Sequence, residues 1–385
     1  MAGHLSWALP SAAANTLLQA RIAWEQPHTK VTVYGLITVL GAVSAVLGTM
    51  VCGGLSDRTK GRFGRRSPWI LGGAVTSAAG LMLTGSTSVF TLEVVGFVIF
   101  QAGMNAMLSA IYALLPDRFA PQTMGQASAV SGIGYLLGTA LGGVAASALA
   151  ADPGLGLRVL PWRMVLAAML LFGPAREEAP ASRAAVRARL SVSMFLSPRD
   201  GDFVRVLLGR FCVLLALYVV VFYQLYLFTD VLELSVKAAA REVALCTIFL
   251  GTGALAALVV TGPLSDRSGR RRPWVVGASV LVGFAGIPPL IEPSLMTMWI
   301  FYGVAGVGYR MYIAVDQALV AEVLPTGGHE AKEMGFMNIA NSAPLVMGLA
   351  VAAAVSLAGY GSLFAVALVL ALAGGVLVQQ VRRVR

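Results

Sequence analysis

GGLSDRTKGRFGRRSPWILGG, residues 53–73, places an acid and a cluster of bases between two apolar runs. A second stretch, GPLSDRSGRRRPWVVGA at residues 262–278, repeats the order of glycine, acid, base cluster, proline and tryptophan. The acids of the two stretches lie 209 positions apart, and so do Leu115 and Leu324, which begin a Leu-Pro turn in each half. Two matches at one offset indicate an internal duplication.

The composition places both halves in a membrane. Of the 385 residues, 57 % are hydrophobic and 12 % are charged, and the mean hydropathy is +0.79, whereas soluble domains carry about 25 % charged residues. Apolar runs of about 20 residues, the length that crosses a hydrocarbon layer of about 30 Å, recur along almost the whole chain. The expected fold class is therefore an all-α membrane protein with no soluble domain.

Hydropathy predicts twelve transmembrane helices in two six-helix bundles related by pseudo-two-fold symmetry. The first bundle is expected over 1–173, a cytoplasmic linker over 174–202 and the second bundle over 203–385. Helices 1 and 6 are expected to be short, because the first begins almost at Met1 and the sixth offers few strongly apolar residues after Trp162. The spans are expected near 4–22, 31–55, 68–86, 90–115, 124–150, 159–173, 203–228, 242–263, 273–291, 295–323, 334–357 and 362–380, with boundaries to within a few residues.

The net charge of +10 reflects topology rather than a nucleic-acid partner. Alternate loops and the C-terminus hold 19 Lys and Arg residues, whereas the loops of the opposite face hold five. By the positive-inside rule the first set faces the cytoplasm, together with both termini. We therefore expect a multi-pass protein of the inner or plasma membrane, monomeric in the lipid bilayer, whose first helix is retained because it lacks a basic n-region.

The quoted loop, GGLSDRTKGRFGRR, resembles the signature loop between helices 2 and 3 of the major facilitator superfamily, and the second stretch resembles its echo between helices 8 and 9. The form RFGRRSPW is similar to the branch that contains sucrose and glycoside symporters. VDQALVAEVLP and AKEMGFMNIANSAP look like actinobacterial members of that region. The resemblance covers essentially the full chain, and it implies secondary transport in which two bundles rock about a central site.

Each loop contains the expected parts of a cytoplasmic latch. An acid is favourable beside a helix N-terminus, and glycines let helices approach closely. The resemblance implies that Asp57 meets the start of helix 11 and that Asp266 meets the start of helix 5 while the outside is open. The alternative reading is that the arginines only anchor the loops in the cytosol. The expected gating residues are Gly54, Asp57, Arg58, Gly64, Arg65, Arg66, Gly262, Asp266, Arg267, Gly269 and Arg270.

Polar and aromatic residues on helices 1, 4, 7 and 10 form the expected transport site, because the resemblance implies that these helices line the cavity. On helices 4 and 10 the candidates recur at spacings that share one helical face. Rings and amides of this kind suit a neutral polyol, and they also suit a polar drug. The candidates are Asn15, Gln19, Arg21, Gln101, Asn105, Tyr112, Tyr223, Gln224, Tyr309, Arg310, Tyr312 and Asp316.

Ionisable residues inside spans are costly, so Asp316 and Arg310 are functional candidates, with Asp316 as the expected proton carrier. The two are six positions apart and lie on different faces, so each could instead pair with another helix. The amides of helix 4 could equally be interhelical hydrogen-bond partners. Arg21 and Glu25, four positions apart, could be an ion pair at the exit side.

Other classes of protein are disfavoured by the motifs. The chain has no P-loop, HEAKE at 329–333 lacks the second histidine of HExxH, and three cysteines without CxxC spacing suggest neither disulfides nor a metal site. We expect no enzyme activity, catalytic residue, metal or cofactor. The prediction is a secondary transporter of a small polar solute, a sugar or glycoside with protons. Export of a drug or secondary metabolite with protons, and a non-transporting membrane sensor of the same fold, are the alternatives.

Overall fold

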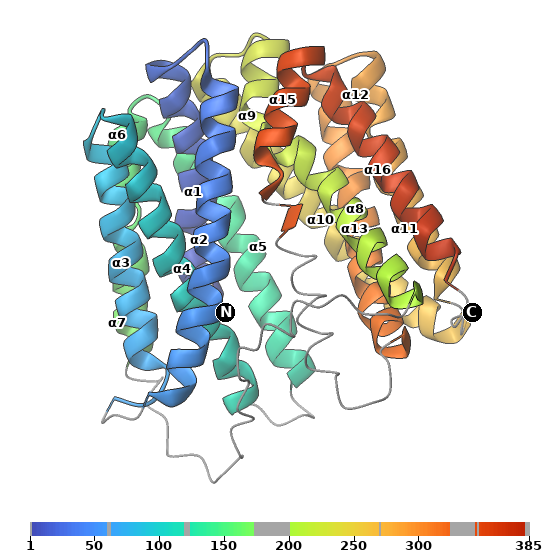
Figure 1. Ribbon diagram of the computed structural model, residues 1–385, viewed down its shortest axis with the longest axis horizontal. Helices are drawn as coiled ribbons and strands as arrows, with labels where there is room; N and C mark the ends of the chain where they lie inside the picture. Colours follow the sequence, from blue (N-terminus) through green and yellow to red (C-terminus); the bar gives the residue numbers. More distant parts are fainter. Residues whose placement is uncertain are drawn as a thin grey trace. The chain divides into compact units, whose positions relative to one another are not determined.

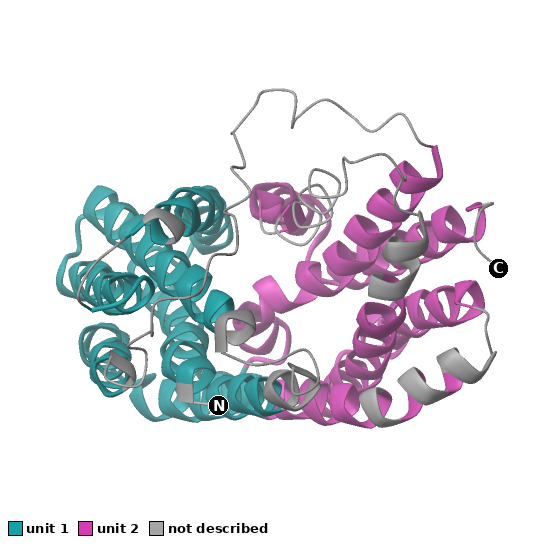
Figure 2. Ribbon diagram, turned by 90° about the horizontal axis from the view of Figure 1, so that it is seen from below, with its two compact units in different colours: residues 1–187, 234–244 teal, residues 188–233, 245–385 magenta. Residues whose placement is uncertain are grey.

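The computed structural model describes residues 2–59, 63–118, 124–172, 201–268, 271–323, 343–344 and 346–381. Within these ranges the chain forms helices joined by turns, without strands (Figure 1). The chain divides into two compact units. Unit 1 consists of residues 1–187 and 234–244, and unit 2 consists of residues 188–233 and 245–385 (Figure 2).

Unit 1 is built from long helices connected by short turns. In this unit α3 packs against α4, α6 and α7, while α1 packs against α5 and α2 packs against α4. The elements are α1 (Ala2–Glu25), α2 (Lys30–Arg58), α3 (Ser67–Ser86), α4 (Phe90–Arg118), α5 (Met124–Leu149), α6 (Pro153–Val159) and α7 (Trp162–Phe172).

Local start signals fix several of these boundaries. Gly64, in the loop before α3, has a φ of 84°, a left-handed conformation that glycine adopts without steric cost. Pro68 then lies in the first turn of α3, where its missing N–H removes no helical hydrogen bond. Asp152 caps α6, because its side chain accepts a hydrogen bond from the Leu155 N–H.

Unit 2 surrounds an apolar core that α8, α11, α13 and α16 share. Nine residues form that core: Phe203, Val206, Val213, Val275, Ala278, Tyr312, Val315, Val378 and Val381. The first residues of α10, up to 244, belong to unit 1. The elements are α8 (Gly201–Phe222), α9 (Gln224–Tyr226), η2 (Leu227–Val231), α10 (Val236–Ser268), α11 (Arg272–Ala285), α12 (Ile287–Ile291), α13 (Leu295–Val323), α15 (Gly348–Ala358) and α16 (Gly361–Gln379).

Two expected spans are interrupted, and a short helix precedes a third. The seventh breaks at Tyr223 and continues through α9 into η2, a π-helical segment. The ninth breaks at Gly286, where two prolines follow and remove backbone N–H donors from the helix. Before the sixth, expected at 159–173, the chain forms the short helix α6, which Leu160 and Pro161 separate from α7. Hydropathy alone treats the seventh and ninth spans as continuous, and only the ninth breaks at a glycine and prolines.

The first helix corrects one expectation. α1 has 24 residues, which at about 1.5 Å per residue is enough to cross a hydrocarbon layer of about 30 Å. It was expected to be short because it begins almost at Met1, but the helix continues through Arg21 and Glu25, which pair with each other. α7 has 11 residues and ends at Phe172, where the described part of the chain also ends.

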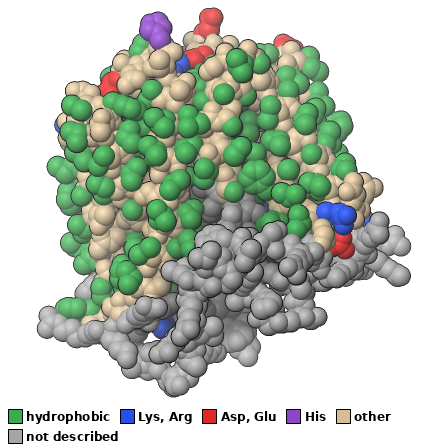
Figure 3. All heavy atoms as spheres, viewed as in Figure 1, with side chains coloured by type: hydrophobic (Ala, Val, Ile, Leu, Met, Phe, Trp, Pro, Cys, Tyr) green, Lys and Arg blue, Asp and Glu red, His purple; other side chains and the backbone are tan. Residues whose placement is uncertain are grey.

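The side chains indicate a membrane environment. Among the described residues, eight helices are long and apolar enough to cross a membrane. Figure 3 shows hydrophobic side chains covering the sides of the helices, with acids and bases near their ends. Exposed Leu47, Leu170 and Val369 illustrate this apolar surface, which is much more extensive than the patches on soluble monomers.

The backbones of α3 and α4 touch at two glycine pairs. A Cβ atom built on Gly80 would lie 2.6 Å from the Gly96 carbonyl oxygen, and one built on Gly96 would lie 2.7 Å from that of Gly80. Gly73 and Gly103 repeat the arrangement at 2.7 and 2.8 Å. Small residues permit this close approach of helices in membranes, where van der Waals packing drives association.

Substitution of Gly80 by valine is therefore expected to destabilise unit 1, by about 1–3 kcal/mol for an overpacked contact. Gly72 is the matched control, because it lies on the same helix and an added Cβ would meet nothing within 4 Å. The melting temperatures of the two purified variants provide the comparison. Equal losses would mean that the lower helix propensity of valine, rather than the contact, sets the effect.

Candidate functional site

A buried ion pair joins α8 to α13 in unit 2. Arg210 Nη1 lies 2.7 Å from Asp316 Oδ2, and the two side chains are 8 % and 0 % exposed. Val206 and Val213, one turn to either side of Arg210, belong to the apolar core. Both charges are thus held in an apolar setting in which each depends on the other, since an unpaired buried ion carries a large desolvation cost.

The pair leaves polar atoms unsatisfied. Asp316 Oδ1 and the Tyr312 hydroxyl are both buried, and neither makes a hydrogen bond of good geometry. Tyr312 lies one turn before Asp316, and its hydroxyl interacts with that carboxylate. Buried polar atoms are normally satisfied, so an open acceptor beside a hydroxyl is a position where a proton or a solute hydroxyl could bind.

Arg210 is a residue that sequence reasoning missed. The expected base was Arg310, which is partly buried on α13 and has no ion pair among the described residues. Arg210 carried the same signal, since it interrupts the apolar run VLLGRFCVLL, and ionisable residues in spans are functional candidates. The partner of Asp316 is therefore on another helix, which was the stated alternative to a role in coupling or solute binding.

Aromatic residues fasten the broken seventh span to its neighbours. The Tyr223 hydroxyl donates to the Gly348 carbonyl at 2.9 Å, which joins the start of α9 to α15. The Tyr302 hydroxyl donates to Gln224 Oε1 at 3.0 Å, which joins α9 to α13. Tyr309, farther along α13, interacts with Tyr218 of α8. Three of the expected site residues, Tyr223, Gln224 and Tyr309, thus already have partners within unit 2.

A further hydrogen bond holds η2, at the end of the broken seventh span. The Tyr360 hydroxyl, between α15 and α16, donates to Asp230 Oδ2 of η2 at 2.7 Å. Burial raises the pKa of Tyr360, and the neighbouring Asp230 carboxylate raises it further. The tyrosine therefore keeps its proton and remains a donor throughout the physiological pH range.

In unit 1 the expected amides turn towards α2. Gln19 of α1 donates from Nε2 to the Tyr34 hydroxyl at 3.2 Å. Asn105 of α4 accepts at Oδ1 from the Thr49 hydroxyl at 3.4 Å and donates to the Gln101 carbonyl at 2.9 Å. These bonds are of the interhelical and intrahelical kind that stabilises packed membrane helices.

The remaining candidates of helices 1 and 4 are more exposed. Asn15 is exposed on α1. Tyr112 is 53 % exposed, and its ring lies edge-on to His4, with 5.3 Å between the ring centroids. Asn105 therefore contacts α2 while Tyr112 contacts the beginning of α1, although both were expected on one face of helix 4.

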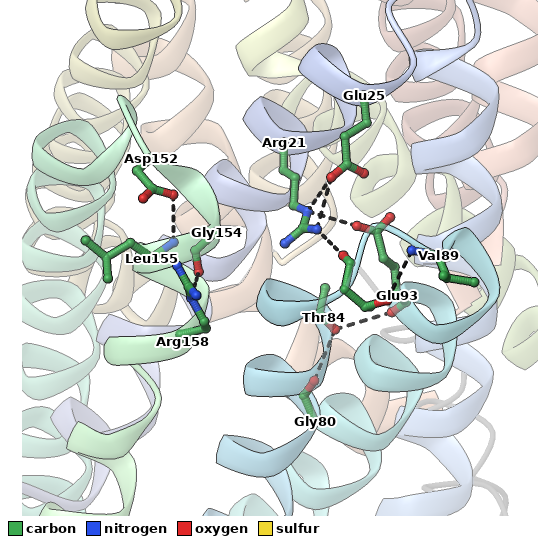
Figure 4. Close-up of polar contacts among 11 residues, drawn as sticks. Arg21, Glu25, Gly80, Thr84, Val89, Glu93, Asp152, Gly154, Leu155 and Arg158 are labelled. Atoms are coloured by element: carbon green, nitrogen blue, oxygen red, sulfur yellow. Dashed lines mark hydrogen bonds and ion pairs between the residues drawn. The ribbon is translucent and has the colours of Figure 1, made fainter.

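Figure 4 shows an ion cluster at the end of α1. Arg21 Nε lies 2.8 Å from Glu93 Oε1 and 3.0 Å from Glu25 Oε1, and Arg21 Nη2 donates to the Thr87 carbonyl. Exposure of the side chains is 10 % for Arg21, 30 % for Glu25 and 2 % for Glu93. The sequence indicated the Arg21–Glu25 pair from its spacing but did not indicate Glu93, an acid in the first turn of α4.

The loop after α2 is held by side-chain hydrogen bonds. Buried Arg66 donates to Ser56 Oγ at 3.0 Å, and Trp69 Nε1 donates to Thr59 Oγ1 at 2.8 Å. Both contacts join the end of α2 to the start of α3. Ser56, Thr59, Arg66 and Trp69 of the quoted stretch thus have a structural role in joining the two helices.

The other gating residues have the following places. Gly54 is exposed on α2, Arg65 lies in the turn before α3 and Gly262 lies in α10. The last turns of α2 and α10 contain Asp57, Arg58, Asp266 and Arg267, whose side chains lie outside the described part of the structure. Gly269 and Arg270 lie wholly outside the described residues. The latch between bundles therefore stays a prediction.

A pocket of about 190 Å³ lies between α8, α15 and α16. Its lining is apolar, with Leu215, Val351 and Leu370 among the contributors. It contains none of the expected site residues. A pocket of this chemistry accepts an apolar group, whereas polyol binding requires convergent hydrogen-bonding groups.

Comparison with known proteins places the fold. A bacterial homologue of the human lysosomal transporter Spinster, solved inward-facing and occupied, has a TM-score of 0.75 at 16 % identity over 99 % of this chain and 96 % of that one. A D-xylose–proton symporter has 0.73 at 14 % identity over 100 % and 96 %. A nucleoside transporter has 0.74 at 12 % identity over 98 % and 97 %. At these identities the likeness shows the fold alone.

The sequence itself supplies the family. No curated protein matches the chain significantly. The profile of the Major Facilitator Superfamily, however, matches residues 2–251 and again residues 206–384. Two matches that together span nearly the whole chain agree with the duplication of the charged loop and with the fold of the solved transporters. The protein is therefore a member of the Major Facilitator Superfamily, a multi-pass membrane transporter.

Proposed function

We propose that this transporter moves a small polar solute, a sugar or glycoside, together with protons across the plasma membrane. In this proposal the bundles 1–173 and 203–385 rock about a central site, and Asp316 carries the proton. The observation that carries the proposal is the buried Arg210–Asp316 pair with an unsatisfied oxygen on its acid.

The chemistry of the pair suits coupling. When Asp316 is ionised, its charge offsets that of Arg210 across 2.7 Å. Protonation removes this attraction from the buried guanidinium, which favours a different arrangement of α8 and α13. A group that changes the relative stability of two arrangements can link proton binding to a conformational step.

The unsatisfied oxygen of the pair supports a hydroxyl-rich solute. Asp316 Oδ1 is buried without a hydrogen-bond partner, and Tyr312 adds a hydroxyl beside the acid. Sugar hydroxyls donate to such oxygens. The form RFGRRSPW in the first loop, which resembles sucrose and glycoside symporters, supports the same substrate class.

Proton-coupled export of a drug or secondary metabolite is the second candidate. The apolar pocket between α8, α15 and α16 favours it, because such a lining suits the apolar part of a drug. The sensor alternative loses part of its support, since α1 is long enough to span a membrane.

External pH around energy-depleted, right-side-out vesicles tests the proposal while a panel of mono- and disaccharides is added. We expect alkalinisation with one sugar, and its loss in the Asp316→Asn variant. Glu292→Gln, at an exposed acid between α12 and α13, is the control and should behave as wild type. If no sugar changes the external pH, and if a drug causes proton release from acid-loaded everted vesicles, the function is export rather than uptake.

A further inference from the structure

We propose that Glu25 and Glu93 share one proton beside Arg21, so that unit 1 has a proton-binding site of its own at the end of α1. The binding of this proton is independent of the solute, but its use in coupling rests on the proton-linked transport proposed above. The site is separate from Asp316, which belongs to unit 2.

The argument begins with the charges. Two carboxylates meet one guanidinium, and both place an oxygen on the same Arg21 nitrogen, at 2.8 Å for Glu93 and 3.0 Å for Glu25. The Glu25 carboxyl also lies within hydrogen-bonding reach of the Glu93 carboxyl. Fully ionised, the cluster would carry one uncompensated negative charge. Two carboxylates that share a site resist simultaneous ionisation, because like charges repel.

Burial strengthens this repulsion. The Glu93 side chain is only 2 % exposed, so water cannot screen its charge effectively. Its Oε1 atom contacts Arg21 as an ion pair without hydrogen-bond geometry, and it has no hydrogen-bond donor. A proton on either glutamate creates an O–H group that can donate to the other carboxyl, which satisfies the missing hydrogen bond and removes the excess charge.

The elements packed around the cluster include a further cation, Lys30 at the start of α2. α3 contributes the Thr84 hydroxyl, which bonds the Glu93 backbone carbonyl, and α2 contributes Tyr34, which is bonded to Gln19.

α6 contributes one acid and one base, and both have other partners. Asp152 caps its own helix by accepting from the Leu155 N–H, and Arg158 donates to the Gly154 carbonyl. Both side chains are exposed at the edge of the cluster (Figure 4). Arg21 therefore remains the cation in contact with Glu25 and Glu93 among the described residues.

The shared proton would control the position of Glu25 at the junction of α1 and α4. With the proton bound, Arg21 holds both helices and the Thr87 carbonyl at one point. With the proton lost, repulsion drives Glu25, the more exposed of the two acids at 30 %, away from Glu93. Occupancy of the site thus sets whether Glu25 stays against Glu93, while the Arg21–Glu93 pair continues to join α1 to α4.

Infrared difference spectra of the purified protein in lipid nanodiscs, recorded between acidic and alkaline buffers without solute, test the site. The C=O stretch of a protonated carboxyl reports the proton directly. We expect the wild type to show such a band, part of which persists in Asp316→Asn. We expect Glu25→Gln and Glu93→Gln each to abolish that persistent part, because the single remaining glutamate forms a one-to-one ion pair with Arg21.

The Glu25→Gln variant keeps the test meaningful if Glu93→Gln fails to fold, because Glu25 is partly exposed. Glu292→Gln, at an exposed acid, should leave the band unchanged. A structural ion cluster with both acids ionised gives no persistent band, and a band that survives Glu25→Gln arises elsewhere; either result overturns the inference. Failure of sugar-dependent proton uptake would instead affect the proposed function and leave this band in place.

Discussion

Replacement of Asp316 by asparagine is expected to abolish proton-coupled uptake and to destabilise unit 2 strongly. The buried guanidinium of Arg210 then loses the carboxylate that lies 2.7 Å away. Removal of one partner from a buried ion pair costs about 3–5 kcal/mol, because it leaves an uncompensated charge. The melting temperature of the purified variant measures the loss of stability, and external pH around energy-depleted vesicles measures the loss of coupling.

The double variant Arg210→Gln with Asp316→Asn separates coupling from packing. Two neutral amides can bond to each other across the same gap, so we expect most of the lost stability to return. Coupling should not return, because neither amide binds a proton. If the double variant couples uptake to protons as well as the wild type does, the pair is only a structural link between α8 and α13.

Replacement of Arg21 by glutamine is expected to destabilise unit 1 more than any single change to its two glutamate partners. The variant leaves Glu25 and Glu93 without their cation and the Thr87 carbonyl without its donor. Loss of the partner of a buried charge again costs about 3–5 kcal/mol. Melting temperatures of purified Arg21→Gln and Glu25→Gln provide the measurement, and the second variant should lose far less.

Two further variants sharpen this comparison. Arg158→Gln removes an exposed arginine from the same end of unit 1, so it should have little effect on the melting temperature. Combining Arg21→Gln with Glu93→Gln removes the more deeply buried of the two acids in the cluster and should recover part of the loss. Equal melting temperatures for Arg21→Gln and Arg158→Gln would show that the cluster does not stabilise unit 1.

The fold followed from hydropathy and from the repeated loop to a large extent. The span expected at 295–323 coincides with α13, and the span expected at 68–86 differs from α3 by one residue. Both helices begin after clear turn signals. The breaks at Tyr223 and Gly286 were not foreseen, because an apolar run has the same hydropathy whether or not its backbone continues as one helix.

The ion partners were harder to predict than the helices. The spacing of four between Arg21 and Glu25 is visible in the sequence, because residues i and i+4 are neighbours on one helix. Glu93 and Arg210 approach their partners from other helices. The rotation of one helix against another is set by packing, so sequence spacing cannot show which charges meet.

The same reason applies to the expected solute site. A helical wheel placed Gln101, Asn105 and Tyr112 on one face, but Asn105 bonds to Thr49 of α2 and Tyr112 lies against His4 of α1. A helix in a bundle has several neighbours, and a face about 40° wide can still span two of them.

The glycine contacts between α3 and α4 have a mechanical consequence. At Gly80–Gly96 and Gly73–Gly103 the carbonyl oxygens of one helix fit against the backbone of the other. No side chain stands between them that could change rotamer and let one helix slide along its partner. Under a pulling force, α3 and α4 should therefore leave the bilayer together in one rupture event, as a single stiff rod.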